Sequence, residues 1–546
     1  MSDIDVRDAA PLEQAAETPE PWWRRDYLPY GLLGLLFAVF TWFTFTQGRV
    51  HGRTYDEYLQ DDYGAAVLRW YLSGGSDRGF LEMPDYLHMP EHGSGFELMI
   101  AWVQHFTNEQ WGTRTVVNGI AGLIGLLIMA LVGKEMAGPW GAFAAATGLA
   151  LYPRYAGAMH NNSKDVPLAV AMLLVLWLVL RLMRRWTAET RRFEVLELMG
   201  IGAALGLAGS IRVNALSWVA LLALLVIGFW IKHGRKLRGA ELRAELARQA
   251  GAVMVIGTNC YLVMSLLWPY LLVYPIEGLR RSVEVMAAYD WDNPILFGGE
   301  MVRSTELPWY YAPWWLIIGS PLPTVLLTLA SAGALVYALV RRRPVDSRLL
   351  LIGGYILLPL VLIIGAHSTL YNSLRQFLFI APGMILLAAV LLVRWAKAAF
   401  KDGKTALAWT LIGAAILGQV EVAVAVARIY PYEYSYFSPV AGGYTTARHN
   451  YESTYYGTCT RAGALWLGEH YRDYTPGEPT FRDEVSWNSL TEADLPDNFV
   501  SIGEGQPVFR LTNGDPGAGY KIVHTVMLEG EPLCNVSVQE QLAPAS

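Results

Sequence analysis

"YGLLGLLFAVFTWFTF" (30–45) is a mainly apolar run, and "RTYDEYLQDDYG" (53–64) follows it with four carboxylates, Asp56, Glu57, Asp61 and Asp62. A helix needs roughly 20 mainly apolar residues to cross about 30 Å of hydrocarbon. The first stretch therefore predicts a membrane span. The acids after it predict that this span ends at a polar membrane surface.

The composition extends this pattern over most of the chain. The 546 residues are 53% apolar and 16% charged, with a mean hydropathy of +0.28, whereas soluble domains carry about 25% charge. Apolar runs predict an all-α polytopic membrane protein with about 11 transmembrane helices, near 28–47, 113–133, 138–152, 166–183, 195–211, 214–231, 250–272, 313–340, 348–366, 376–395 and 405–427. The stretch 96–106 is too short to cross and is expected at the membrane surface.

Basic residues between the spans predict the orientation. If eleven spans alternate, all the Lys- and Arg-rich segments fall on one side, namely "WWRR" (22–25), "RRWTAETRR" (184–192), "KHGRKLRGAELRAELAR" (232–248), "RRRPVDSR" (341–348) and "RWAKAAFKDGK" (394–404). Short loops rich in Lys and Arg stay in the cytoplasm. We therefore expect a plasma (inner) membrane protein with a disordered cytoplasmic tail, residues 1–27. The other face then carries loops 48–112, 153–165 and 273–312.

The C-terminal segment, residues 428–546, follows the membrane domain (28–427) on that same outer face. It is polar, has Gly/Pro turn signals and contains alternating stretches such as "YKIVHTVML" (520–528), which predicts a small extracytoplasmic α/β or mainly β domain. Cys459 and Cys534 both fall in it. Since the outer compartment is oxidising, a disulfide between them is expected, with two free thiols as the alternative. Cys260 lies inside a span and is expected to serve packing.

The acids after the first span have a structural and a functional interpretation. Carboxylates favour the first turn of a helix, which accounts for Asp61 and Asp62. Asp56 and Glu57 come within about ten residues of the end of the span, and acids held near hydrocarbon are costly and often functional. The sequence therefore favours a functional role for Asp56 and Glu57.

A second polar segment, "YPRYAGAMHNNSKDVPLAV" (152–170), lies between two spans. A helix N-terminus explains Asp165 and Pro167, but it leaves the polar run before them unexplained. A carboxylate, Lys164 and His160 together are suited to bind a phosphate and a metal or an acceptor hydroxyl.

Two arginines fall at the outer ends of spans. Arg212 is in "GSIRVNAL" and Arg375 is in "LYNSLRQFLF". Each arginine either extends its side chain to the membrane surface or pairs with an anionic lipid headgroup.

Four blocks of this sequence, in order, resemble those of bacterial GT-C glycosyltransferases of family 39. They are "DEYLQDDYG", "HNNSKDVP", "LYNSLRQFLFI" and "YPYEYSYFSPVAGGY…YESTYYGTC". The family blocks read approximately DE..Q..YG, H.NPKD.P, LY...R.FLF and HPYEY.YFN…GG…DYWG. Protein O-mannosyltransferases and lipid A aminoarabinose transferases belong to this family, and the likeness extends to about residue 460.

The resemblance implies a GT-C fold and an activity. Such enzymes move a sugar from a polyprenyl phosphate to an acceptor outside the cytoplasm, usually with inversion. Asp56 matches the first-loop acid, which acts as general base or as a metal-bound orienter of the acceptor, and Glu57 matches its partner. Asp165 matches the second-loop acid, so Asp56 and Asp165 are the expected ligands if Mg, Mn or Ca takes part. The cations expected to bind the donor phosphate are Lys164, Arg375, Arg212 and His160.

The sequence departs from the family pattern at Ser163, where Pro is usual, at Tyr430, which replaces His, and at "STYYG" (453–457) in place of "DYWG". The last departure leaves any role of the C-terminal domain open. The rival interpretations are a secondary transporter or flippase of a lipid-linked precursor, which the mid-span Glu421 favours, and a scaffold without activity.

Other partners follow from what the sequence contains. It has no Gly-rich phosphate loop, so no nucleotide cofactor is expected, and no basic-aromatic patch, so no nucleic acid is expected. Membrane lipids, a lipid-linked donor and an extracytoplasmic acceptor are the expected partners. The donated sugar (mannose, aminoarabinose, galacturonic acid or arabinofuranose) and the acceptor (protein, lipid or envelope glycan) stay open.

Overall fold

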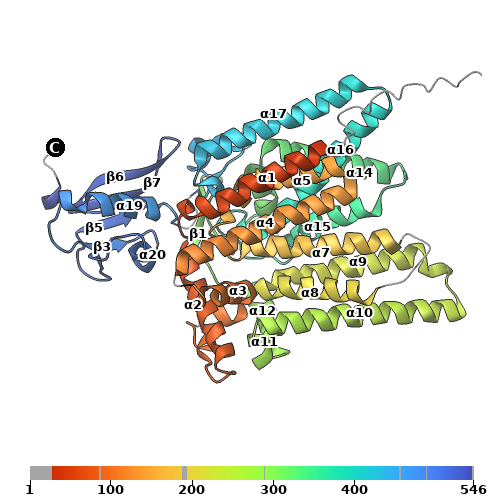
Figure 1. Ribbon diagram of the computed structural model, residues 1–546, viewed down its shortest axis with the longest axis horizontal. Coiled ribbons are helices and arrows are strands. Elements are labelled where there is room, and N and C mark those ends of the chain that lie inside the picture. Colours follow the sequence, from red (N-terminus) through yellow and green to blue (C-terminus); the bar gives the residue numbers. More distant parts are fainter. Residues whose placement is uncertain are drawn as a thin grey trace, which may run out of the picture.

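A computed structural model describes residues 27–84, 88–107, 109–186, 194–287, 289–453, 457–486 and 488–543. The expected disordered tail, apart from Tyr27, lies outside these residues. The long helices run side by side in a bundle, and a small sheet domain stands at one end of it (Figure 1). The predicted fold class is confirmed: the chain is a mainly helical polytopic membrane protein with a small C-terminal sheet domain.

Each apolar run predicted from the sequence contains one long helix of the bundle, and the runs near 250–272 and 313–340 also take in the short helices α11(Tyr270–Val273) and α13(Tyr311–Ile318). The helices are α1(Tyr27–Thr46), α4(Gln110–Ala137), α5(Pro139–Ala150), α7(Asp165–Trp186), α8(Val195–Ile211), α9(Ser217–Lys232), α10(Gly239–Leu267), α14(Leu322–Val340), α15(Ser347–Gly365), α16(Ala381–Lys401) and α17(Thr405–Ile429). Among the described residues, nine segments have the length and hydropathy to cross a membrane. The two helices outside these nine segments are α5, with 12 residues, and α8, with 17. α9 has 16 residues and belongs to the segment Val213–Lys236. Helices satisfy every backbone polar group internally, as hydrocarbon requires.

The centre of the bundle is formed by α4, α7 and α16. In the most apolar 18-residue stretch of each helix, the buried share of residues is 83% in the α16 segment and 61% in α4 and in α7. The same share is 11% in α1 and 6% in α17. Small residues allow close approach in this region. A Cβ built on Gly133 of α4 would lie 2.2 Å from the carbonyl oxygen of Gly141 in α5, so the two helices touch backbone to backbone.

The shorter helices and a hairpin gather at the end of the bundle nearest the sheet domain (Figure 1). They include α2(Tyr55–Leu72), α3(Gly95–Gln104), α6(Pro153–Ala158), α11(Tyr270–Val273), α12(Glu277–Ala287) and α13(Tyr311–Ile318), with strands β1(Pro294–Phe297) and β2(Glu300–Arg303). The segment near 96–106, which was expected at the membrane surface, forms the short helix α3. The three loops expected on one face therefore share one end of the bundle.

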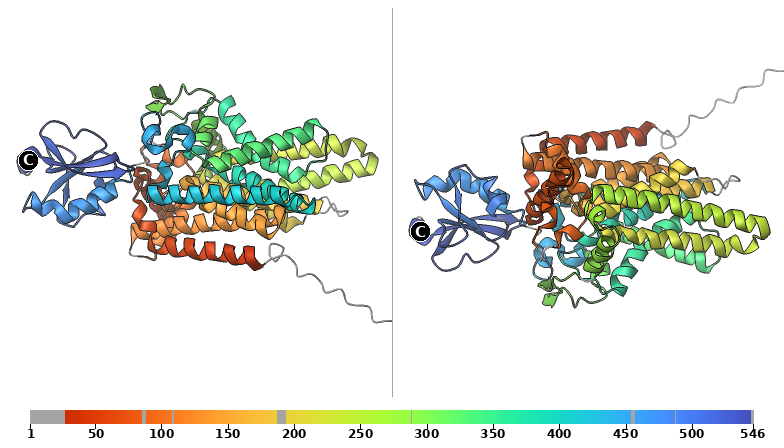
Figure 2. Two further views of the ribbon diagram at one scale, coloured as in Figure 1. Left: turned by 90° about the horizontal axis from the view of Figure 1, so that it is seen from above. Right: turned by 90° about the horizontal axis from the view of Figure 1, so that it is seen from below.

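The C-terminal domain is a mixed α/β unit. Its five strands are β3(Thr480–Asp483), β4(Val500–Ser501), β5(Phe509–Thr512), β6(Tyr520–Leu528) and β7(Glu531–Gln539), in the order β4-β3-β5-β7-β6. β3 pairs in parallel with β4 and β5, and the other pairs are antiparallel. The helices are α18(Gly443–Ala447), which precedes the sheet, α19(Thr460–His470), which packs against β6 and β7, and α20(Asn488–Glu492). The domain projects from the end of the bundle in both views of Figure 2.

Two cysteines lie where this domain meets the bundle. Cys459 immediately precedes α19, Cys534 lies in β7, and both are buried free thiols. Burial, followed by the contact with Cys459, raises the pKa of Cys534. The two thiols are neighbours without a bond between them, so the disulfide stays a prediction. Cys260 is buried in α10, as expected for a packing residue.

Alkylation distinguishes a disulfide between Cys459 and Cys534 from two free thiols, because only free thiols react. Protein purified without reductant should take up label at Cys260 alone after denaturation, and at all three cysteines after reduction. Mass spectrometry of the alkylated peptides measures this, with Cys459→Ser as the control that frees Cys534. Three labelled cysteines without reductant would contradict the disulfide.

Gly52 packs so closely that a side chain should not fit. Its φ is +69°, and a Cβ there would lie 2.4 Å from the carbonyl oxygen of Thr458. Gly403 has the similar φ of +72° but has no atom within 4 Å of a built Cβ. Gly403→Ala should cost only the left-handed backbone penalty, roughly 1–2 kcal/mol. Gly52→Ala should lower the unfolding temperature in detergent by clearly more, because it adds a clash with backbone and because the ψ of 177° at Gly52 is essentially restricted to glycine. Equal shifts in the two variants would contradict this packing.

Candidate active site

The first turn of α2 sets two adjacent acids in different surroundings. Thr54 is the N-cap residue of α2. The Glu57 carboxylate accepts a hydrogen bond from the backbone N–H of Thr54 at 3.0 Å, in a capping-box arrangement. The Glu57 side chain is 4% exposed, whereas that of Asp56 is 32% exposed. Asp56 therefore faces accessible space while Glu57 points into the protein.

A cavity collects residues from both predicted acidic loops. Asp56 and Asp165 line it together with three cations, Lys164, Arg212 and Arg375. The structure thus brings together every predicted site residue except His160, since Glu57 lines this cavity too.

A second cavity of about 140 Å³ adjoins the first, because the two share Asp56 and the same three cations. Its further lining is mainly apolar or neutral and includes Asn214, Tyr289, Thr369 and Tyr371. A ligand in the shared region would therefore meet cations and Asp56, with uncharged polar groups beyond them.

Each of the two loop acids is paired with an arginine. Arg375 Nη1 lies 2.6 Å from Asp56 Oδ2, and Arg212 Nη2 lies 3.2 Å from Asp165 Oδ1. Asp165 also accepts a hydrogen bond from Asn162 Nδ2 at 2.7 Å. Asp165 is held more firmly, since its side chain is 2% exposed.

Lys164 supplies the third cation. Its Nζ donates to the carbonyl oxygen of Gly93 at 2.5 Å, and its side chain is buried. Burial lowers the pKa of Lys164 to about 8. The region shared by the two cavities is lined by three cations, Lys164, Arg212 and Arg375, and by one carboxylate, Asp56, so it suits an anion when Lys164 is protonated.

The segment that presents Arg375 is conformationally strained. Asn372 and Ser373 both adopt left-handed backbone, with φ of 56° and 65°. Asn372 Nδ2 donates to the Tyr55 hydroxyl at 3.2 Å, and the Ser373 N–H donates to Glu452 at 3.3 Å. Strain of this kind persists where surrounding contacts determine the conformation, and such places cluster at functional sites.

A buried arginine that the sequence analysis did not identify organises the acids. Arg114, in the first turns of α4, lies 3.1 Å from Glu57, 2.8 Å from Glu97 and 3.4 Å from Asp61, and it donates to Ser163 Oγ at 2.7 Å. All five side chains are buried. Burial raises the pKa of Glu57 to about 7, and Arg114 opposes this. Glu57 is therefore placed as a structural partner of Arg114, beside Asp56.

A sequence signal for this network did exist. Arg114 stands at the start of an apolar run, as Arg212 and Arg375 stand at span ends, and Glu97 is a lone acid in the apolar "GFELMI" (95–100). Lone charges at span ends need partners. The acids of α2 need a cation, which points to Arg114, and the lone Glu97 needs a cation as well.

His160 does not reach the cavity, which corrects the expectation that it binds phosphate. Its ring stacks on His51 with centroids 4.8 Å apart, and its Nε2 lies 3.4 Å from Thr44 Oγ1. Burial, then the neighbouring His51, lowers the pKa of His160. The buried, neutral imidazole of His160 packs against α1 and against His51, which follows α1, so it contributes to the core.

The residues present do not fit a divalent metal. In the described part of the chain, no group of three or more His, Cys, Asp or Glu side chains is arranged to hold an ion. Mg²⁺ and Ca²⁺ take six or more oxygen ligands, largely carboxylates, carbonyls and water. Asp56 and Asp165, the expected ligands, each face an arginine, and Lys164 lies at the same cavity. The charge there opposes a cation.

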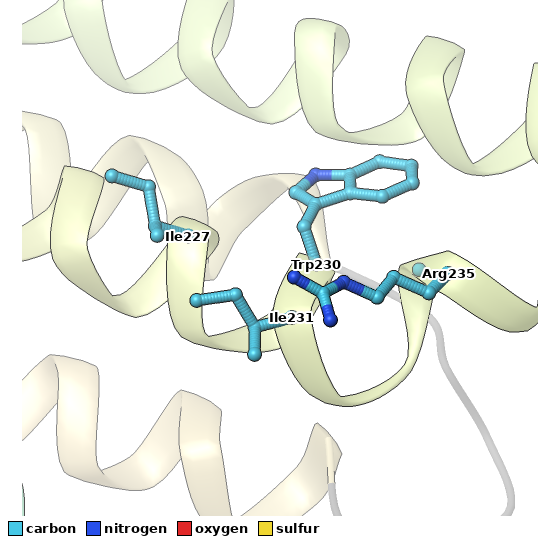
Figure 3. Close-up of a pocket in the computed structure, with 5 residues that line it drawn as sticks. Ile227, Trp230, Ile231 and Arg235 are labelled. Atoms are coloured by element: carbon cyan, nitrogen blue, oxygen red, sulfur yellow. The ribbon is translucent and has the colours of Figure 1, made fainter.

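A further depression is unlike this site. It has a volume of about 330 Å³, is lined by Ile227, Trp230, Ile231, Gly234 and Arg235 at the end of α9, and lies at the bundle end away from α2 (Figures 1 and 3). The side chain of Arg235 extends back toward Trp230 and Ile231 (Figure 3). With one cation and no acid, it has no group to activate an acceptor.

Two proteins with solved structures follow a similar chain course. ArnT from Cupriavidus metallidurans, bound to undecaprenyl phosphate, aligns over 94% of this chain and 99% of its own, with 15% identity and a TM-score of 0.48. The oligosaccharyltransferase of Archaeoglobus fulgidus, in the apo form, aligns over 88% of this chain and 65% of its own, with 13% identity and a TM-score of 0.48. These likenesses concern the course of the chain alone. No protein-family model and no curated protein matches the chain.

The lowered pKa of Lys164 predicts a basic limb in activity. Lys164 is charged below about pH 8 and neutral above it, so the cavity loses one cation as the pH rises. If this cation binds donor phosphate, kcat/KM for the donor should fall about tenfold per pH unit above pH 8, because kcat/KM reports ionisations of the free enzyme. Lys164→Met should lower kcat/KM and remove this limb. A wild-type profile that stays flat to pH 10 would contradict the assignment.

Proposed function

We propose that this chain is a membrane glycosyltransferase that moves a sugar from a polyprenyl-phosphate donor to an acceptor at the extracytoplasmic surface of the plasma membrane. The observation that carries the proposal is the shared cavity, in which the Asp56 carboxylate lies beside Lys164, Arg212 and Arg375. Cations suit a lipid phosphate, and a carboxylate suits an acceptor hydroxyl. The position of this cavity at one end of the apolar bundle suits a donor whose tail stays in the membrane.

The chemistry divides between these groups. Asp56 accepts the proton of the acceptor hydroxyl while the hydroxyl oxygen of the acceptor attacks the anomeric carbon of the donor sugar. The new bond to the acceptor forms on the face opposite the phosphate, so the configuration inverts while the bond to the phosphate oxygen breaks. The bonding electrons leave with the polyprenyl phosphate. Lys164, Arg212 and Arg375 stabilise the negative charge that develops on it.

Arg375 has two partners in this scheme. Without donor, it pairs with Asp56 at 2.6 Å. A bound phosphate competes for the same guanidinium, which releases the Asp56 carboxylate toward the acceptor. Because Asp56 is 32% exposed, it has room to exchange partners. Asp165 stays fixed by Arg212 and Asn162, and it orients Arg212 toward the phosphate.

The transporter interpretation has less support. A transporter places ionisable groups near the middle of the membrane, between two related halves. Glu421 lies on the exposed face of α17, a peripheral helix, and it does not line either cavity of the candidate site. The charged residues of the candidate site lie at the end of the bundle.

The orientation belongs to the same proposal. The Lys- and Arg-rich connections around residues 234–243, 341–348 and 394–404 follow or precede helices at the bundle end away from α2 (Figure 1). Such connections face the cytoplasm, so the cavity and the C-terminal domain face outward.

Asp56→Asn tests the assignment. Purified protein in lipid would be supplied with a radiolabelled prenyl-phosphate sugar, and the release of prenyl phosphate would be followed with membrane extract as the acceptor source. Loss of a general base costs about 10²–10⁴-fold, so Asp56→Asn should lower kcat by about that factor with little change in KM for the donor.

Asp62→Asn is the matched control, because Asp62 is an exposed carboxylate about 1.7 turns along the same helix. It should keep wild-type turnover. Full turnover by Asp56→Asn would refute the base, and failure of wild-type protein to consume any prenyl-phosphate sugar would refute the proposed function.

A further inference from the structure

The C-terminal domain reaches the start of α2 through one arginine. Arg53 immediately precedes the N-cap of α2. Its Nη1 donates to Asp494 Oδ2 at 2.7 Å and to the carbonyl oxygen of Leu490 in α20 at 2.7 Å, and its Nη2 donates to Asp494 Oδ1 at 3.1 Å. Two guanidinium nitrogens therefore grip one carboxylate, an arrangement that fixes direction as well as distance.

This link is withdrawn from water. The side chains of Arg53 and Asp494 are 14% and 6% exposed. Arg461 of α19 pairs with Asp494 Oδ1, the oxygen to which Arg53 Nη2 also donates. The Arg53 guanidinium lies 5.1 Å from the ring centroid of Trp111 at the start of α4. Asp494 thus joins α19 and α20 of the C-terminal domain to the segment that begins α2.

Backbone packing restrains the same segment. Gly52 lies against the carbonyl oxygen of Thr458, where a Cβ would come within 2.4 Å. On its other side, Asn161 Nδ2 donates to the Gly52 carbonyl oxygen at 3.2 Å. Residues 52 and 53 are therefore held between the C-terminal domain and the loop that carries Lys164 and Asp165.

We infer that Asp494 is a positioning residue: through Arg53, the C-terminal domain fixes the first turn of α2 and thereby sets Asp56 against Arg375. The consequence for rate depends on the proposed function. A misplacement of about 1 Å can cost about 10²-fold in rate, so a restraint three residues from Asp56 is close enough to matter. The role needs no contact between Asp494 and substrate.

The variants that test this are Asp494→Asn and Arg53→Gln, which break the link from opposite sides. Asp497→Asn is the matched control, because Asp497 is an exposed carboxylate three residues further along the same loop. Hydrogen–deuterium exchange of residues 53–60 measures positioning without any substrate. Both link variants should raise exchange there, and the control should leave it unchanged.

Kinetics give the second measurement. Asp494→Asn should lower kcat by about 10–100-fold and leave KM for the donor within about twofold, because the phosphate-binding cations are untouched. Asp494→Glu should restore part of the rate. In the Arg53→Gln background, Asp494→Asn should add little, since residues acting as one unit are not additive.

The outcomes separate the two proposals. Unchanged exchange at residues 53–60 in both link variants, with wild-type kcat, would overturn the positioning role. If Asp494→Asn does not fold, Arg53→Gln decides it, because that variant leaves the Asp494–Arg461 pair intact. If wild-type protein transfers no sugar, the proposed function fails, while the exchange measurement still decides whether Asp494 fixes α2.

Discussion

The end of the molecule that carries the candidate site depends on the ion pairs and hydrogen bonds of the buried Arg114 guanidinium. It holds Glu57 of α2, Glu97 of α3 and Ser163 of the loop before α7 at one point at the start of α4. Removing one partner of a buried ion pair costs about 3–5 kcal/mol, because the remaining charge stays uncompensated. Here one cation serves several carboxylates. Glu57 and Asp61, which follow the first span, can therefore stay charged near hydrocarbon because Arg114 of α4 pairs with them.

That arrangement separates fixed acids from an accessible one. Glu57 and Asp56 are neighbours in sequence, yet a helix points adjacent side chains about 100° apart. Glu57 caps the helix and pairs with Arg114, whereas Asp56 reaches the cavity and pairs with Arg375. The first pair is closed to water and the second is partly open. A carboxylate that has to change partners during a reaction is therefore supported by one that does not.

The sequence predicted the bundle well because the membrane imposes a simple requirement. Every apolar run of sufficient length became a helix, and the loops that alternate between spans had to meet at one end. For that reason the approach of Asp56, Asp165, Arg212 and Arg375 was predictable before their contacts were known. The positions of these charged residues at the ends of spans were enough to predict that they meet, without knowledge of how the helices pack.

What the sequence missed depends on side-chain direction and on distant pairs. His160 lies four residues before Lys164, but the turn between them sends its ring into the core beside His51. Arg53 and Asp494 are separated by 441 positions, and neither stands in a periodic pattern. The likeness to family motifs also ends at about residue 460, before Asp494. A contact of this kind follows from the path of the whole chain.

The charge balance of the cavity connects these points to the chemistry. A lipid phosphate brings negative charge to a boundary where the surroundings are only partly aqueous, so each cation there acts more strongly than it would in water. In the proposed reaction, Lys164, Arg212 and Arg375 would supply that stabilisation. Two of these cations are neutralised by Asp56 and Asp165 when no anion is present. In the proposed function, the phosphate would replace Asp56 rather than Asp165 as the partner of an arginine, because Asp56 is the more exposed of the two acids.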